Sequence, residues 1–147
     1  MTLIARIETE LKEAMQERDA ERRDALRLIL AALRSAEKEL QRPLHDDEEL
    51  QVLQRERKRR IEAAEAFRAG GREGQAEAEE DELEILEEFM PEQLSDDELA
   101  ELVGAAVEEA GAESPKEMGK VMSIVMPKVE GRADGKRVSQ AVRERLE

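Results

Sequence analysis

The side chains that could act as nucleophiles are few in this sequence. It has no cysteine, which excludes thiol chemistry, disulfides and cysteine-based metal sites. Its five serines lie in expected helices or at helix starts, and none lies in a nucleophile-elbow sequence. They are Ser35, Ser95, Ser114, Ser123 and Ser139. Glutamine hydrolysis needs an activated Cys or Ser beside an oxyanion loop, so we predict no catalytic residue and no autonomous activity.

Two further kinds of site find little support. The segment His45-Asp46-Asp47-Glu48 has one histidine and no second ligand motif, so a loop and a helix cap explain it better than a metal site. The glycine-rich segment 70–74 lacks the Lys-Ser/Thr ending and the preceding strand of a nucleotide-binding loop. We therefore interpret it as a helix break and predict neither a metal nor a cofactor.

Two groups of basic side chains could bind phosphates. The first is a run inside one expected helix and comprises Arg55, Arg57, Lys58, Arg59 and Arg60. Its simpler interpretation is a solvated face with ion pairs at one-turn spacing, such as Glu56 with Arg60. The second group surrounds a short helix and the turn after it and comprises Lys116, Lys120, Lys128, Arg132, Lys136 and Arg137. Cations at a helix N-terminus form a phosphate site, although basic residues are also common in solvated turns.

The charge of the chain is distributed unevenly. Its net charge is −14, yet residues 1–72 hold 16 basic and 16 acidic side chains. Residues 73–113 hold 17 acidic side chains and no Lys or Arg, whereas residues 114–147 hold 8 basic and 5 acidic ones. A basic end of this kind can bind a polyanion, although a solvated acidic helix face is the commoner reason for a run of Glu. Because no aromatic residue lies near the basic end, an RNA there would be held by backbone and shape.

The N-terminal part should consist of four helices, and the third of them should contain the basic run at residues 55–60. Apolar residues recur at three- and four-residue steps from Leu3 to Ala14 and from Leu26 to Leu40, and Pro43 should end the second helix. Asp46 and Glu49 predict a reciprocal cap for a third helix that runs to Gly70-Gly71. A fourth helix should stop ahead of Pro91.

The C-terminal part should form a small domain of its own. Ser95 and Glu98 predict a capped helix that stops near Gly111. Ser114, Pro115 and Glu117 predict a second helix start, and Pro127 should end that helix. A last helix should include Val138 to Leu146. No alternating pattern predicts a strand, so we expect an all-α protein with a multi-helix domain over 1–91 and a three-helix domain over 94–147.

No apolar run reaches membrane-spanning length, and the first residues are amphipathic and acid-bearing. From these features we expect a cytoplasmic protein that does not associate with a membrane. The oligomeric state stays open.

The stretch MGKVMSIVMPKVEGRADGKRVSQAVRERL, residues 118–146, resembles the YqeY family. The same family pattern continues upstream in residues 26–39, 46–72 and 80–99, so the resemblance covers almost the whole chain. The C-terminal domain of that family is similar to the tail of the B subunit of the glutamine-dependent Asp/Glu-tRNA amidotransferase. That tail engages the body of the tRNA, while the glutaminase and kinase chemistry lies elsewhere in the enzyme.

The resemblance implies a helical module that binds tRNA or another RNA without catalysis. It transfers the tRNA contacts to Lys120, Lys128, Arg132 and Lys136, with Gly119, Gly131 and Gly135 shaping the backbone, while Glu130 departs from the pattern by placing an acid in the basic turn. Two alternatives stay open. One is the carbon–nitrogen ligase activity with glutamine as amide donor that is attached to the family, and the other is a protein-interaction scaffold whose acidic helices meet a basic partner. The expected partners are therefore tRNA, an amidotransferase or another protein.

Overall fold

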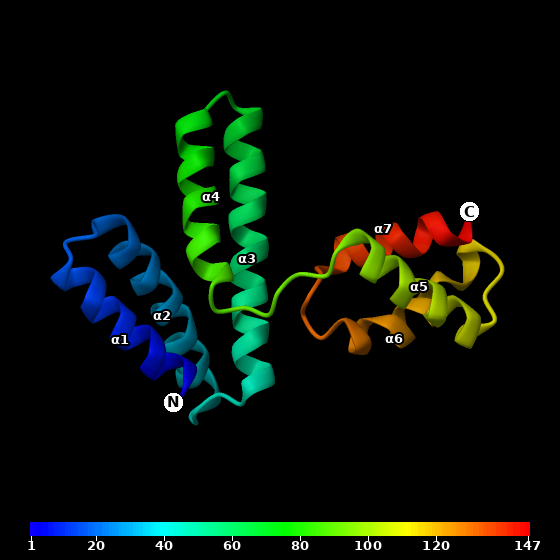
Figure 1. Ribbon diagram of the computed structural model, residues 1–147, viewed down its shortest axis with the longest axis horizontal. Helices are drawn as coiled ribbons and strands as arrows, with labels where there is room; N and C mark the ends of the chain where they lie inside the picture. The colour runs from blue at the N-terminus through cyan, green and yellow to red at the C-terminus, as the bar shows by residue number, and fades with distance from the viewer. The chain divides into compact units, whose positions relative to one another are not determined.

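A computed structural model describes residues 1–147 and contains seven α-helices, one 3-10 helix and no strand. The helices are α1 (Leu3–Gln16), α2 (Ala20–Leu40), α3 (Asp46–Ala69), α4 (Glu73–Glu87), α5 (Asp96–Ala110), the 3-10 helix η1 (Pro115–Glu117), α6 (Met118–Val129) and α7 (Gly135–Leu146). The prediction of an all-α protein is confirmed. The chain forms two compact units, Met1–Met90 and Pro91–Glu147, which we call the N-terminal unit and the C-terminal unit (Figure 1).

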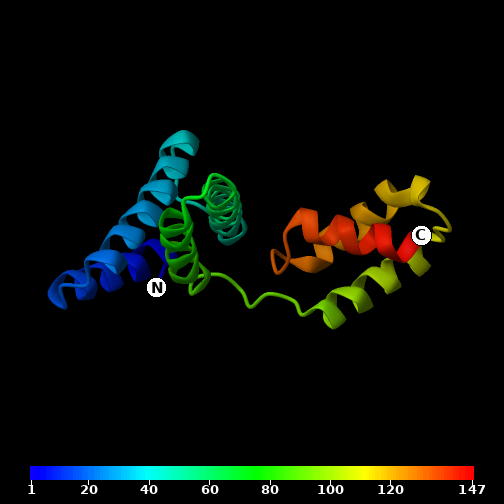
Figure 2. The same cartoon turned by 90° about the horizontal axis from the view of Figure 1, so that it is seen from above.

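The N-terminal unit consists of two helical hairpins, α1–α2 and α3–α4, and α2 also contacts both helices of the second hairpin. Figure 2 looks nearly along α3 and α4 while α1 and α2 run across the view, so the hairpins cross. Apolar side chains from all four helices meet where they cross and provide the main stabilisation of this unit. The core consists of Ile7, Ala14, Leu26, Ile29, Leu33, Val52, Leu53, Leu86 and Phe89.

Helix α2 ends ahead of Pro43 as the sequence predicted, whereas the start of α3 differs from its prediction by one residue. Helix α2 stops at Leu40 because Gln41 adopts a left-handed conformation with φ 56°, two residues before Pro43. Helix α3 has its reciprocal contact one residue earlier than expected, since the backbone N–H of His45 donates to the Glu48 carboxylate at 2.9 Å. Both oxygens of Glu48 also accept hydrogen bonds from the Arg42 guanidinium, at 2.7 and 2.8 Å.

The C-terminal unit packs α5, α6 and α7 around an aliphatic core. Helix α5 begins as predicted, because the Ser95 hydroxyl accepts from the backbone N–H of Glu98 while the Glu98 carboxylate accepts from that of Ser95, both at 3.1 Å. The core consists of Leu94, Leu99, Val103, Ala106, Val121, Val125, Val129, Ala133, Val138, Val142 and Leu146. Independent folding of each unit stays a prediction.

Two predictions about α6 are wrong. The Ser114 side chain makes no capping hydrogen bond, and η1 occupies the expected start, so that the α-helix begins only at Met118. Pro127 lies inside α6 instead of ending it. Val125 and Val129, one turn apart on the same face, are both fully buried, so packing carries the helix past a residue that lacks a backbone N–H.

Candidate nucleic-acid interface

The C-terminal basic group is divided between two regions of its unit. Lys128 lies in the last turn of α6, Arg132 in the connection to α7, and Lys136 and Arg137 in the first turn of α7, so chain continuity brings these four together. Lys120 lies in the first turn of α6, about 12 Å along the helix axis from Lys128. The structure therefore places Lys120 away from the turn that was expected to gather all the cations.

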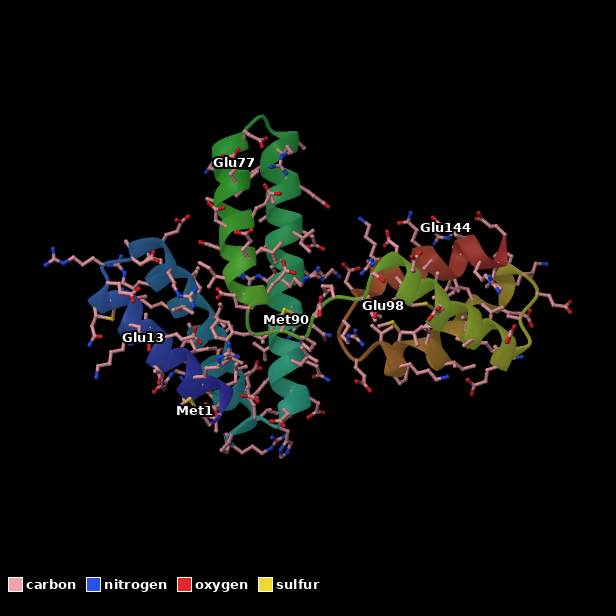
Figure 3. All side chains as sticks on the ribbon, viewed as in Figure 1. Met1, Glu13, Glu77, Met90, Glu98 and Glu144 are labelled. Atoms are coloured by element: carbon pink, nitrogen blue, oxygen red, sulfur yellow. The ribbon has the colours of Figure 1, made fainter.

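Helix α5 supplies carboxylates to three cations of this group. The pairs are Lys128 with Glu109 at 2.9 Å, Arg132 with Glu98 at 3.7 Å and Arg137 with Asp96 at 2.9 Å. Figure 3 labels Glu98 at the start of α5. Hydrogen bonds from Ser95 and the charge of Arg132 lower the pKa of Glu98, so this carboxylate is ionised at neutral pH. Part of the acidic segment 73–113 thus neutralises cations of the basic segment 114–147.

Arg132 also has a structural role in the connection between α6 and α7. Its Nε donates to the carbonyl of Glu92 at 3.1 Å, and its own carbonyl accepts from the backbone N–H of Leu94 at 2.7 Å. The turn itself depends on two left-handed residues, Glu130 with φ 51° and Gly131 with φ 76°. Glycine is favoured at the second position because it has no Cβ, and this explains Gly131 in structural terms.

The N-terminus of α7 carries an acidic cap. The Asp134 side chain accepts a hydrogen bond from the backbone N–H of Arg137 at 2.8 Å. An anion approaching this end of the helix would meet the Asp134 carboxylate. Gly135 is exposed, with open space where a side chain would begin, and Lys136 beside it is also exposed. A phosphate could therefore reach Lys136 from outside the turn more readily than it could reach the backbone N–H groups.

Five cations of the C-terminal unit make no ion pair and lie exposed, and they are Lys116, Lys120, Lys136, Arg143 and Arg145. Sequence reasoning missed Arg143 and Arg145 as candidates. Their positions beside the inward-facing Val142 and Leu146 could have indicated that they are exposed, although the Arg145 guanidinium lies over Gly104 of α5. Gly119, next to Lys120, likewise has open space where a side chain would begin, so nothing shields this turn of α6.

The basic run of α3 is more fully neutralised. Its ion pairs are Arg57 with Glu87 at 3.7 Å, Lys58 with Glu62 at 4.0 Å, Arg59 with Glu56 at 3.5 Å, and Arg60 with Glu56 at 2.8 Å and with Glu82 at 3.6 Å. The expected pair of Glu56 with Arg60 is present. The sequence predicted that these cations lie on a solvated face of the helix. Arg60 does not, because it is only 6% exposed. Arg55 is exposed and makes no ion pair.

Ser123, Ser139 and Glu48 have structural explanations. The hydroxyls of Ser123 and Ser139 donate to helix carbonyls three residues earlier, at 2.9 and 3.0 Å. No group of three or more His, Cys, Asp or Glu side chains is arranged to hold a metal ion. The Glu48 carboxylate caps α3 by accepting a hydrogen bond from the backbone N–H of His45. Hydrogen bonds from Arg42 and His45 lower the pKa of Glu48 to about 2, so this capping group is ionised at neutral pH.

None of the helices has the length and apolar character that crossing a membrane requires.

Comparisons with known proteins agree with the resemblance seen in the sequence. The family model described as Yqey-like protein matches residues 4–146. The chain is also 30% identical over 146 residues to a protein of Pyrenophora tritici-repentis named Altered inheritance of mitochondria protein 41, mitochondrial. That alignment covers 97% of this chain and 80% of the fungal protein.

Proposed function

Because this chain belongs to the YqeY family, we propose that its C-terminal unit binds RNA, with tRNA as the first candidate, and performs no catalysis of its own. The resemblance of residues 118–146 to an amidotransferase tail supports tRNA as the ligand. An amidotransferase acting on that tRNA is then the expected protein partner. We also propose a cytoplasmic location, although the name of the fungal relative includes the word mitochondrial.

The observation that carries this proposal is the set of unpaired, exposed cations on η1, α6 and α7. Lys136 and Arg143 lie two turns apart on one face of α7, about 10 Å along the axis, which is compatible with contacts to successive phosphates. Lys116 and Lys120 lie one turn apart before and on α6. Both phenylalanines of the chain lie in the N-terminal unit, so base stacking would not contribute. Recognition would rest on phosphate charge and on the shape of a folded RNA.

The test is a titration of fluorescently labelled total tRNA with the full chain over a salt series. Phosphate binding releases counterions, so the affinity should fall steeply as salt rises. The double variant Lys120→Ala/Lys136→Ala should lose on the order of 1 kcal/mol of binding free energy per contact and show a shallower salt slope. The matched double variant Arg132→Ala/Arg137→Ala removes cations that α5 already neutralises, so it should lose less.

A third double variant, Arg57→Ala/Arg59→Ala, distinguishes the two basic groups. Binding lost only in this variant would move the site to α3, and tRNA binding without salt dependence, or no binding at all, would refute the proposal. The purified chain should release no ammonia from glutamine and hydrolyse no ATP. Turnover that disappears when one serine is replaced would establish the ligase alternative instead.

A further inference from the structure

A groove of about 450 Å³ lies in the N-terminal unit between α2, α3 and α4, the helices labelled in Figure 1. One side is apolar and is formed by Leu28, Ala31 and Ala32 of α2 together with Ala63 of α3. The other side is acidic and includes Glu79 and Glu82 of α4. The groove thus combines an apolar strip with a charged edge, and it belongs to a different unit from the proposed RNA site.

The apolar strip contains one of the few large hydrophobic side chains that the fold leaves in water. Leu28 is 49% exposed, although α2 buries Leu26, Ile29 and Leu33 on its opposite side. Ala31 follows Leu28 by three residues and so continues the same face of the helix. A partner that covered Leu28 would gain favourable free energy, because apolar surface would leave water.

Carboxylates continue this groove along the face of α2 toward its N-terminus. Asp24 and Glu21 precede Leu28 by four and seven residues and therefore lie on the same face of α2. The side chains of Glu21 and Asp81 are in contact, and the Asp81 charge raises the pKa of Glu21. Burial, followed by the charge of Glu79, raises the pKa of Glu82. Asp24 forms an ion pair with Arg23 at 3.0 Å, whereas Glu21, Asp81 and Glu79 make no ion pair, so negative charge remains between α2 and α4.

The cations that line the groove are already engaged. Arg60 is bonded to Glu56 at 2.8 Å and lies 3.6 Å from Glu82, and Arg59 also pairs with Glu56. Arg60 offsets only part of the charge that Glu79, Glu82 and the α2 carboxylates bring to the edge. An anion such as RNA would be repelled at this edge, whereas a cation would be attracted.

We propose that this groove binds a basic amphipathic helix of a partner protein. Apolar residues at one-turn spacing on that helix would cover Leu28 and the alanines, and Lys or Arg beside them would pair with Glu79, Glu82 and the α2 carboxylates. The face of α2 from Glu21 to Ala32 extends for about 16 Å, which matches three turns of a docked helix. The proposal is independent of RNA binding, because it uses only the N-terminal unit.

The test is fluorescence anisotropy of a labelled 20-residue helical peptide with the full chain at physiological salt. The peptide carries Leu at i, i+3, i+4 and i+7 positions and Lys or Arg on both flanks, and a scrambled peptide of the same composition is the control. We expect binding of the amphipathic peptide, weaker binding of the scrambled one, and a loss of about tenfold or more in Leu28→Glu and in Glu79→Lys.

The matched controls are Leu40→Glu and Glu77→Lys. Leu40 is 44% exposed on α2, and Glu77 is an exposed residue of α4 labelled in Figure 3, and neither lines the groove. These two variants should bind the peptide like the unaltered chain, and circular dichroism should show all four folded. Absence of binding, equal binding of the scrambled peptide, or equal loss in the control variants would overturn the proposal. Because Leu28 and Glu79 are tested separately, misfolding of one variant would leave the other decisive.

Discussion

The two units use the same acidic run in different ways. Glu82 and Glu87 of α4 contact Arg60 and Arg57, whose side chains are 7% and 16% exposed, whereas carboxylates of α5 contact Lys128 and Arg132, which are 46% and 38% exposed. Arg60 and Arg57 are therefore part of the packing of the N-terminal unit, whereas Arg68, which pairs with Glu73 and Glu80 of α4, is 44% exposed. In the C-terminal unit the pairs lie in water, where they contribute little to stability and exchange readily. A phosphate ligand would therefore displace a carboxylate from these exposed pairs more easily than from Arg60, and it would contact the unpaired cations of the C-terminal unit most easily of all.

The largest expected effect tests whether the two units are separate. Replacing the fully buried Leu33 by Ala should lower the free energy of unfolding of the N-terminal unit by about 2–5 kcal/mol, because a cavity remains. Hydrogen exchange read by mass spectrometry should show faster exchange only in peptides from residues 1–90. The matched change Val125→Ala should affect only residues 91–147. Equal loss of protection across the whole chain in either variant would mean that the chain unfolds as one body.

The second prediction concerns the buried and the exposed arginine. Arg60→Met should cost about 1–3 kcal/mol of unfolding free energy, because Glu56 and Glu82 lose a partner in a partly dry site. Arg137→Met should cost at most about 1 kcal/mol, since its partner Asp96 is 97% exposed. Urea denaturation of both variants measures the difference. An equal loss of unfolding free energy in the two variants would show that burial does not strengthen the Arg60 ion pairs relative to the Arg137 ion pair.

The third prediction compares two serines that the sequence presents as equivalent caps. Ser95→Ala should lower the unfolding free energy of the C-terminal unit by about 1 kcal/mol, because the N–H of Glu98 loses its acceptor. Ser114→Ala should change it by less than about 0.5 kcal/mol, because Ser114 makes no capping hydrogen bond. Thermal unfolding of the two variants, measured side by side, decides the matter. A larger effect at Ser114 would contradict the observed start of α6.

The smallest effect is a pH dependence at the start of α3. The pKa of Glu48 is lowered to about 2, so the folded state binds a proton less readily than the unfolded chain. Its contribution is therefore fully present above the unfolded pKa, near 4.3, and is lost as the pH falls toward 2. Glu48→Gln should lower the unfolding midpoint at pH 7 and make little difference at pH 2. A constant difference between pH 7 and pH 2 would exclude an ionised cap, and Glu77→Gln serves as the control.

The helices and the caps at Ser95 and Gly70-Gly71 could be predicted from the sequence, because they depend on residues within one or two helical turns of one another. The sequence predicted that α2 ends ahead of Pro43 but not that Gln41 forms its cap, and the predicted end of α6 was wrong. Gln41 adopts a left-handed conformation that its residue type does not require, and buried Val125 and Val129 extend α6 through Pro127. At the end of α6, tertiary packing outweighed the usual effect of proline.

For the candidate site, the order of residues identifies which side chains carry positive charge, and it contains no cysteine or nucleophile motif beside them. Which of these cations remain unpaired depends on how the helices pack. The pairs Arg137–Asp96 and Arg132–Glu98 join residues more than thirty positions apart, and Arg60 is buried because α4 folds over α3. Such pairing depends on which helices pack together. The spacing of charged residues along the sequence does not indicate how far apart they lie on two packed helices. The same packing creates the groove beside Leu28. Leu28 is exposed although hydrophobic neighbours on both sides of it in the sequence are buried, so the sequence alone would not predict its exposure.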